Sequence, residues 1–104
     1  MSQPDFRQLM EKAQEMQARL AAAQRELARR RVEASAGGGM VTAVATGELR
    51  IAEIRIEPGV YDSGDRALLQ DLILAAVNAA LVRAREMVQQ ELQHLALTPG
   101  PAGD

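Results

Sequence analysis

The sequence predicts an α+β fold in which a long N-terminal helix, a small antiparallel meander of two to three strands and a long C-terminal helix build a dimeric core. Apolar residues near the N-terminus repeat at alternating spacings of three and four, the period of a helix. The middle of the chain is rich in Val, Ile and Thr between glycine-rich turns, and the last third is helical in pattern again. We expect one domain over residues 1–97, with helices at about 5–31 and 65–97 and strands within about 31–57.

The first helix is predicted by a seven-residue repeat whose apolar positions form one seam. No glycine or proline interrupts the chain from Asp5 to Arg31, and the remaining positions are good helix formers. About 27 helical residues reach roughly 40 Å, whereas a compact chain of this size has a radius of gyration of roughly 13 Å. We therefore expect the helix to project or to lean on a second chain. The seam consists of Phe6, Leu9, Ala13, Met16, Leu20, Ala23 and Leu27.

The meander is predicted by two segments rich in strand-forming residues, Met40–Thr46 and Leu49–Glu57. Gly37–Gly39 precedes the first segment and Pro58–Gly59 follows the second, so we expect turns there and an irregular connection over 61–65.

The isoleucines of the second segment predict a bulge. Leu49 and Ile51 share one phase of the alternation, and Ile54 and Ile56 share the other. If all four are buried on one face of the sheet, an extra residue must be inserted, so we expect a bulge near Ala52 or Glu53.

The second helix is predicted to begin after a cap at Ser63 or Asp65 and to be buried on more than one side. Its first half is apolar over most of its circumference, which suits contact with its own sheet and with a partner subunit. Asn78 is a lone amide there, and we expect it to be hydrogen-bonded across the subunit interface. A disordered tail is expected over 98–104. The candidate dimer-interface residues are Leu72, Ile73, Ala76, Val77, Asn78, Ala80 and Leu81.

The composition argues against an enzyme. The chain has no cysteine and one histidine, His94, and it has no serine in a nucleophile motif. The triple glycine lacks a Gly-Lys-Ser/Thr ending, so we interpret it as a turn and not a phosphate loop. We expect no catalytic residues, cofactor, metal or small-molecule substrate. Neither the polar N-terminus nor the apolar run Leu72–Val82 predicts a signal peptide or a membrane span.

The charges are unevenly distributed along the chain. Residues 1–31 carry seven Lys and Arg against four Asp and Glu, and residues 32–104 carry five against ten. The two parts therefore differ in sign, which indicates that the first helix meets an anionic partner or the acidic part of a neighbouring subunit.

Three segments together resemble the bacterial YbaB/EbfC family of nucleoid-associated proteins. Leu9–Leu20 resembles the family's first helix, Val32–Val60 its glycine turn and sheet, and Asp71–Glu86 its second-helix signature. The resemblance implies an α+β homodimer that binds duplex DNA largely without sequence preference in the bacterial cytoplasm, at the nucleoid, with projecting helices. This chain departs from family relatives in having a single lysine, Lys12.

The candidate DNA contacts are basic side chains that pair with phosphates. Alternatives stay open: arginines near a helix C-terminus also bond to its last carbonyls, and Glu15 is placed to pair with Arg19 on a solvated face. A second hypothesis is a protein–protein adaptor that docks another helix on the seam through Phe6, Leu9, Met16 and Leu20. The candidate DNA-binding residues are Lys12, Arg19, Arg25, Arg29, Arg30, Arg31, Arg83 and Arg85, with the first three expected on roughly one side of the helix.

Overall fold

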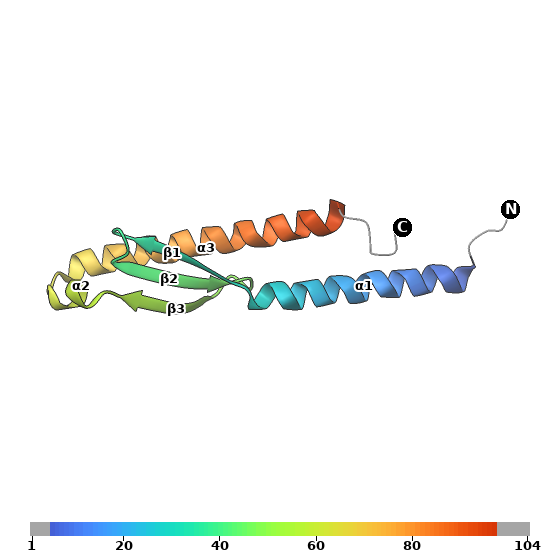
Figure 1. The fold of residues 1–104 in the computed structure, drawn as a ribbon, viewed down its shortest axis with the longest axis horizontal. Helices are drawn as coiled ribbons and strands as arrows, with labels where there is room; N and C mark the ends of the chain where they lie inside the picture. The colour runs from blue at the N-terminus through green and yellow to red at the C-terminus, as the bar shows by residue number, and fades with distance from the viewer. Residues whose placement is uncertain (1–4, 98–104) are drawn as a thin grey trace.

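The computed structural model describes residues 5–97 and confirms the α+β fold (Figure 1). The segment expected to form a disordered tail, 98–104, lies outside the described residues. The elements in chain order are α1 (Phe6–Arg29), β1 (Arg31–Ala36), β2 (Val41–Thr46), β3 (Ile51–Ile56), α2 (Pro58–Asp62) and α3 (Arg66–Leu97).

The three strands form one antiparallel sheet in the order β1-β2-β3. Gly37, Gly38 and Gly39 make the β1–β2 turn with φ of 64°, 67° and 102°, a conformation that glycine adopts without strain. The expected bulge is confirmed, because Val44 pairs with Glu53 while Ala45 pairs with Ile51, which leaves Ala52 as the extra residue.

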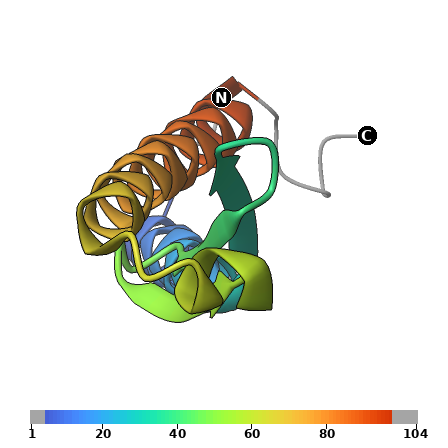
Figure 2. The same cartoon turned by 90° about the vertical axis from the view of Figure 1, so that its left-hand side faces the viewer.

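The core lies between α3 and one face of the sheet (Figure 2). Ala76, Ala80 and Ala84 recur every four residues on α3, and all three are fully buried. They pack against the inner face of β1 and β2, whose buried residues are Ala34, Val41, Ala43 and Ala45. Small side chains therefore set the distance between helix and sheet.

The first helix projects from the sheet, as expected. The molecule measures 77 × 17 × 17 Å with a radius of gyration of 20.9 Å, well above the roughly 13 Å of a compact chain of this size. Leu27 is the one buried residue of α1, and it lies at the end that joins the sheet. There the backbone N–H of Gly47 donates to the carbonyl of Arg30 at 3.1 Å.

The connection between β3 and α3 differs from the expected irregular segment. It contains a short helix, α2, which begins at Pro58. Proline is compatible with the first turn of a helix, because the N–H group that it lacks would have no partner within the helix. The expected cap of α3 is confirmed at Asp65, whose Oδ1 accepts from the N–H of Leu68 at 3.0 Å.

By length and composition, α3 is apolar enough over Arg66–Ala96 to cross a membrane, which the sequence interpretation had not expected. In the structure this helix instead packs along the sheet through Ala76, Ala80 and Ala84, as core helices do. Large side chains elsewhere on it, including Leu74 at 61% and Val82 at 46% exposure, remain uncovered.

Substituting Gly47 by alanine should lower the free energy of unfolding by about 1–3 kcal/mol, because a Cβ at this position overlaps the backbone carbonyl of Leu27. Urea denaturation measures the change. Gly59→Ala is the matched control, since a Cβ there meets no atom within 4 Å. Equal stability of the two variants would contradict the close approach of α1 to the β2–β3 turn.

Candidate nucleic-acid interface

The four candidate DNA contacts on α1 lie in two rows along the projecting helix, which also carries Arg7. Lys12 and Arg19 are seven residues apart and share one side, whereas Arg25 and Arg29 are four apart and share another. The expectation that Arg25 lies with Lys12 and Arg19 was wrong, because six residues of an α-helix turn about 600°, which places Arg25 about 120° round the axis from Arg19. All four side chains are exposed.

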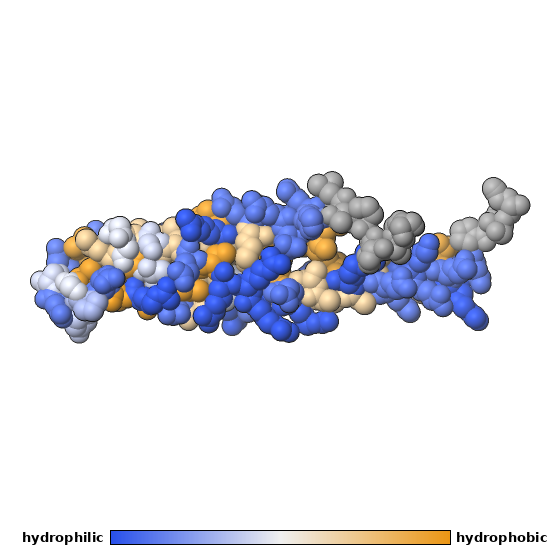
Figure 3. All heavy atoms as spheres, in the orientation of Figure 1, coloured by the Kyte–Doolittle hydropathy of each residue, from blue (hydrophilic) through white to orange (hydrophobic). Residues whose placement is uncertain are grey.

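Within residues 5–97, no ion pair of 4.0 Å or less involves these four side chains. The alternative pairing of Glu15 with Arg19 is therefore not formed. Hydrophilic side chains cover most of the projecting part of α1 in Figure 3, whereas apolar residues gather over the sheet and α3. The α1 surface accordingly presents cations directly to solvent.

The arginine cluster at the base of α1 is divided among three environments. Arg29 ends the helix, Arg30 is extended and Arg31 is already the first residue of β1, so the helix ends two residues before the predicted position. Arg30 Nη1 lies 3.1 Å from Glu91 Oε1 of α3, and Arg31 Nη1 lies 3.7 Å from Glu53 Oε1 of β3. Two of the three guanidiniums thus have carboxylate partners.

The two candidate arginines of α3 have different surroundings. Arg83 Nη1 donates to the backbone carbonyl of Glu33 at 2.7 Å, so its side chain ties α3 to β1. Arg85 is exposed, and no ion pair within the described part of the chain involves it. Both residues are therefore exposed, but Arg83 also makes a contact between α3 and β1.

The outer face of the sheet carries a charge network that the sequence interpretation missed. Arg55 Nη2 lies 3.0 Å from Glu33 and Arg55 Nη1 lies 2.9 Å from Glu53, a bridge that crosses β2 over the buried Val44. Hydrogen bonds to Glu33 and then to Glu53 raise the pKa of Arg55 above its ordinary value. The two-residue spacing of Glu53 and Arg55 places both side chains on one face of a strand, and this spacing is visible in the sequence. That Glu33 of β1 lies close enough to pair with Arg55 depends on the strand register, which only the structure gives.

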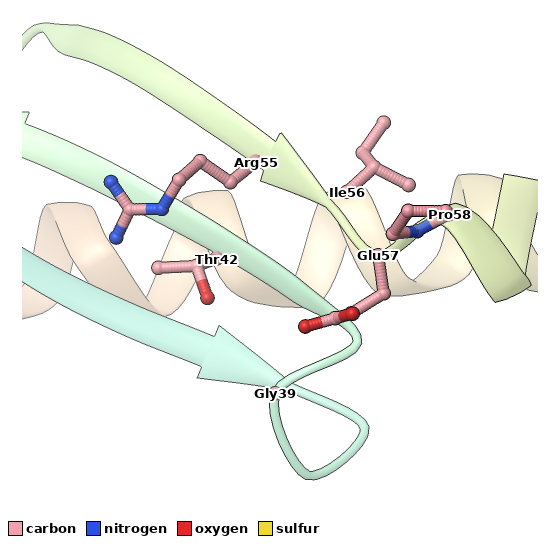
Figure 4. Close-up of a pocket in the computed structure, with 6 residues that line it drawn as sticks. All are labelled: Gly39, Thr42, Arg55, Ile56, Glu57 and Pro58. Atoms are coloured by element: carbon pink, nitrogen blue, oxygen red, sulfur yellow. The ribbon is translucent and has the colours of Figure 1, made fainter.

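A partly open pocket lies beside this network at the end of β3 (Figure 4). Its charged groups are Arg55, which already has two carboxylate partners, and Glu57. It therefore offers no unpaired cation to a phosphate. The lining residues are Gly39, Thr42, Arg55, Ile56, Glu57 and Pro58.

The candidate interface residues of α3 fall into three groups. Ala76 and Ala80 are fully buried under the chain's own sheet, so the structure assigns them to the core and leaves them no surface for a partner. Asn78 is exposed in the single chain. The others are half-buried at the edge of the core and retain some surface: Leu72, Ile73, Val77 and Leu81.

The apolar seam of α1 is largely uncovered. Phe6 is 74% and Met16 is 65% exposed, and Leu9 and Leu20 are also exposed. The seam ends in the buried Leu27, so it runs continuously from the solvent into the junction with the sheet. An uncovered apolar seam of this length is the feature that the adaptor hypothesis requires.

Comparison with known proteins places this architecture among bacterial DNA-binding proteins. The model of the YbaB/EbfC DNA-binding family matches residues 2–99. A nucleoid-associated protein of Acetivibrio thermocellus is 54% identical over 87 residues, 84% of this chain and 77% of that protein. One of Streptomyces avermitilis is 46% identical over 101 residues, 97% of this chain and 89% of that protein.

The fold is also found in a crystal structure of an uncharacterized protein from Helicobacter pylori. The TM-score is 0.70 at 20% sequence identity, and the match covers 92% of this chain and all of that one, 100%. At this identity the likeness supports the fold.

Arg83→Ala should lower the free energy of unfolding by about 0.5–1.5 kcal/mol, because it removes a hydrogen bond that joins α3 to β1. Arg85→Ala makes the same chemical change at an exposed position two residues along the helix, so it should leave stability nearly unchanged. Chemical denaturation of both variants checks this. If the two variants are equally destabilised, Arg83 has no anchoring role.

Proposed function

The chain belongs to the YbaB/EbfC DNA-binding family, and from this premise we propose that it binds duplex DNA as a homodimer, largely without sequence preference, through contacts of Arg and Lys to phosphates. The observation that carries the proposal is the two rows of exposed cations on α1, the helix that projects from the sheet; none of these cations forms an ion pair within the described residues. A projecting helix of about 36 Å spans roughly one turn of a duplex, so several of its cations can reach phosphates together.

The proposed mechanism is neutralisation of phosphates with release of condensed counterions. Lys12, Arg19, Arg25 and Arg29 make the most accessible contacts, and Arg85 adds a further exposed cation on α3. Arg30 and Arg31 contact DNA when a phosphate replaces their carboxylate partners, and Arg83 contacts DNA when a phosphate replaces the Glu33 carbonyl or when another of its N–H groups is used. Binding through phosphates alone carries no base information, so affinity should be sequence-tolerant, on the order of micromolar or weaker per unit at physiological salt.

The composition favours duplex over single-stranded DNA. The chain has one Phe, one Tyr and no Trp, so it has few aromatic rings on which unpaired bases can stack. We place the protein in the bacterial cytoplasm at the nucleoid, with no cofactor, metal, small-molecule substrate or enzymatic activity. Several dimers on one duplex would strengthen binding through multivalency.

The homodimer is supported by the apolar surface that the single chain leaves open. α3 packs mainly across β1 and β2 and touches β3 less, so Ile54 on the inner face of β3 is 41% exposed. Val77, Leu81 and the exposed Leu74 continue this surface around α3. A second copy of the same surface would cover it, with Asn78 as the polar group that fixes the pairing.

The adaptor hypothesis is the second candidate, and the exposed seam of α1 favours it. Phe6, Leu9, Met16 and Leu20 are uncovered in the single chain and suit an amphipathic partner helix. The two hypotheses use different sides of α1, because DNA requires the basic rows and the adaptor requires the seam.

Fluorescence anisotropy with random-sequence duplexes across a salt series tests DNA binding, using protein of verified mass in solution. We expect the logarithm of the binding constant to fall linearly with the logarithm of the salt concentration, with a slope of several units that does not depend on the DNA sequence. Arg29→Gln should lower the magnitude of this slope by about 0.9 for each phosphate that Arg29 neutralises. Arg66→Gln is the matched control, since it removes one exposed arginine from the first residue of α3, which begins beside α2 at the end of the sheet away from α1 (Figure 1). A folded dimer without binding at low salt would favour the adaptor instead.

Leu74→Glu should convert the dimer to a folded monomer, because it places a charge within the apolar surface proposed for the interface. Analytical ultracentrifugation measures the mass. Gln90→Glu adds the same carboxylate on the opposite side of α3 and should leave the dimer intact. A Leu74→Glu protein that remains dimeric would locate the interface elsewhere.

A further inference from the structure

We propose that Glu91 of α3 competes with DNA phosphates for Arg30, so that the protein restrains part of its own basic surface until a phosphate displaces the carboxylate. The inference rests on the proposed DNA-binding function and assigns a regulatory role to an acidic residue at that site. Its basis is the ion pair between Arg30 Nη1 and Glu91 Oε1, 3.1 Å apart.

The pair joins two parts of the chain that project from the same end of the sheet. Arg30 follows the last residue of α1 in extended conformation, and Glu91 lies on the half of α3 that extends beyond the strands (Figure 1). The two residues are 61 positions apart, so the tertiary fold and not local sequence brings them together. Arg30 is thereby directed toward α3, whereas its neighbour Arg29 is exposed with no such partner within residues 5–97.

The pair is accessible enough to be exchanged. The side chain of Arg30 is 45% exposed and that of Glu91 is 28% exposed, so water and an incoming phosphate reach the guanidinium. An ion pair of this kind contributes little to stability. A DNA phosphate carries the same single negative charge as a carboxylate and likewise accepts two N–H bonds from a guanidinium, but the duplex adds the field of the neighbouring phosphates and the release of counterions. Binding of Arg30 to DNA is therefore favourable, but the loss of the ion pair with Glu91 makes its free energy less favourable.

Glu91 is better suited to this role than Glu53, the partner of Arg31. Glu53 also binds Arg55 at 2.9 Å and belongs to the network across the sheet, so its removal disturbs two arginines. Within the described residues Glu91 pairs with Arg30 alone, so its removal changes one ion pair.

A double-mutant cycle tests the competition by duplex anisotropy at low salt. Glu91→Gln and Glu86→Gln each remove one negative charge from α3, but only the first releases an arginine, because Glu86 is exposed with no ion pair in the described part of the chain. Each is measured alone and together with Arg30→Gln, and circular dichroism verifies that all variants are folded. We expect Glu91→Gln to raise affinity about two- to fivefold above Glu86→Gln, a difference that Arg30→Gln abolishes.

Three other outcomes would contradict either the competition between Glu91 and phosphate or the proposed function itself. Equal effects of the two glutamine variants in both backgrounds would show that only net charge matters and would overturn the competition. A lower affinity of Glu91→Gln would show that the pair positions α3 for binding, which also overturns it. If the unmodified protein shows no salt-dependent binding, the proposed function fails, whereas binding with equal variants leaves that function intact and removes only this inference.

Discussion

The packing of a row of alanines on α3 against the inner face of the sheet is the constraint on which the rest of the structure depends. Ala76, Ala80 and Ala84 bring the helix backbone close to β1 and β2, and Val41 is the largest fully buried side chain. Such a core is closely packed but buries little apolar area, so its contribution to stability is small. The larger apolar side chains of the chain consequently lie outside it.

The position of these larger side chains explains why a single chain leaves apolar surface exposed to solvent. One face of α3 is covered by the sheet, while Leu74 and Val82 on other faces are exposed, and Ile54 extends the uncovered surface onto β3. The same exposure accounts for the composition of α3, which is apolar enough for a membrane span although the helix packs on a sheet. The proposed second subunit would account for both observations, because it would cover the apolar sides that the small core leaves open.

The projection of α1 has an electrostatic consequence. Acidic residues of the sheet and α3 neutralise basic residues that lie close to them, as Glu91 does for Arg30 and Glu53 for Arg31. Arg19 and Arg25 lie farther out on α1, and no carboxylate of the described residues forms an ion pair with them. A chain of formal net charge −2 thus presents a positive helix to its surroundings, which overall charge alone does not reveal.

Local features were determined by the sequence itself: the helical repeat of α1, the bulge at Ala52 and the cap at Asp65 depend on residues a few positions apart, and the structure confirms them. The end of α1 and the short α2 were missed, because propensity leaves helix boundaries uncertain. For the candidate site, sequence identified the basic residues but not their partners. Only the tertiary structure decided that Arg30 meets Glu91 and that Arg83 meets the Glu33 carbonyl, because these contacts join residues 61 and 50 positions apart, beyond the reach of any local pattern.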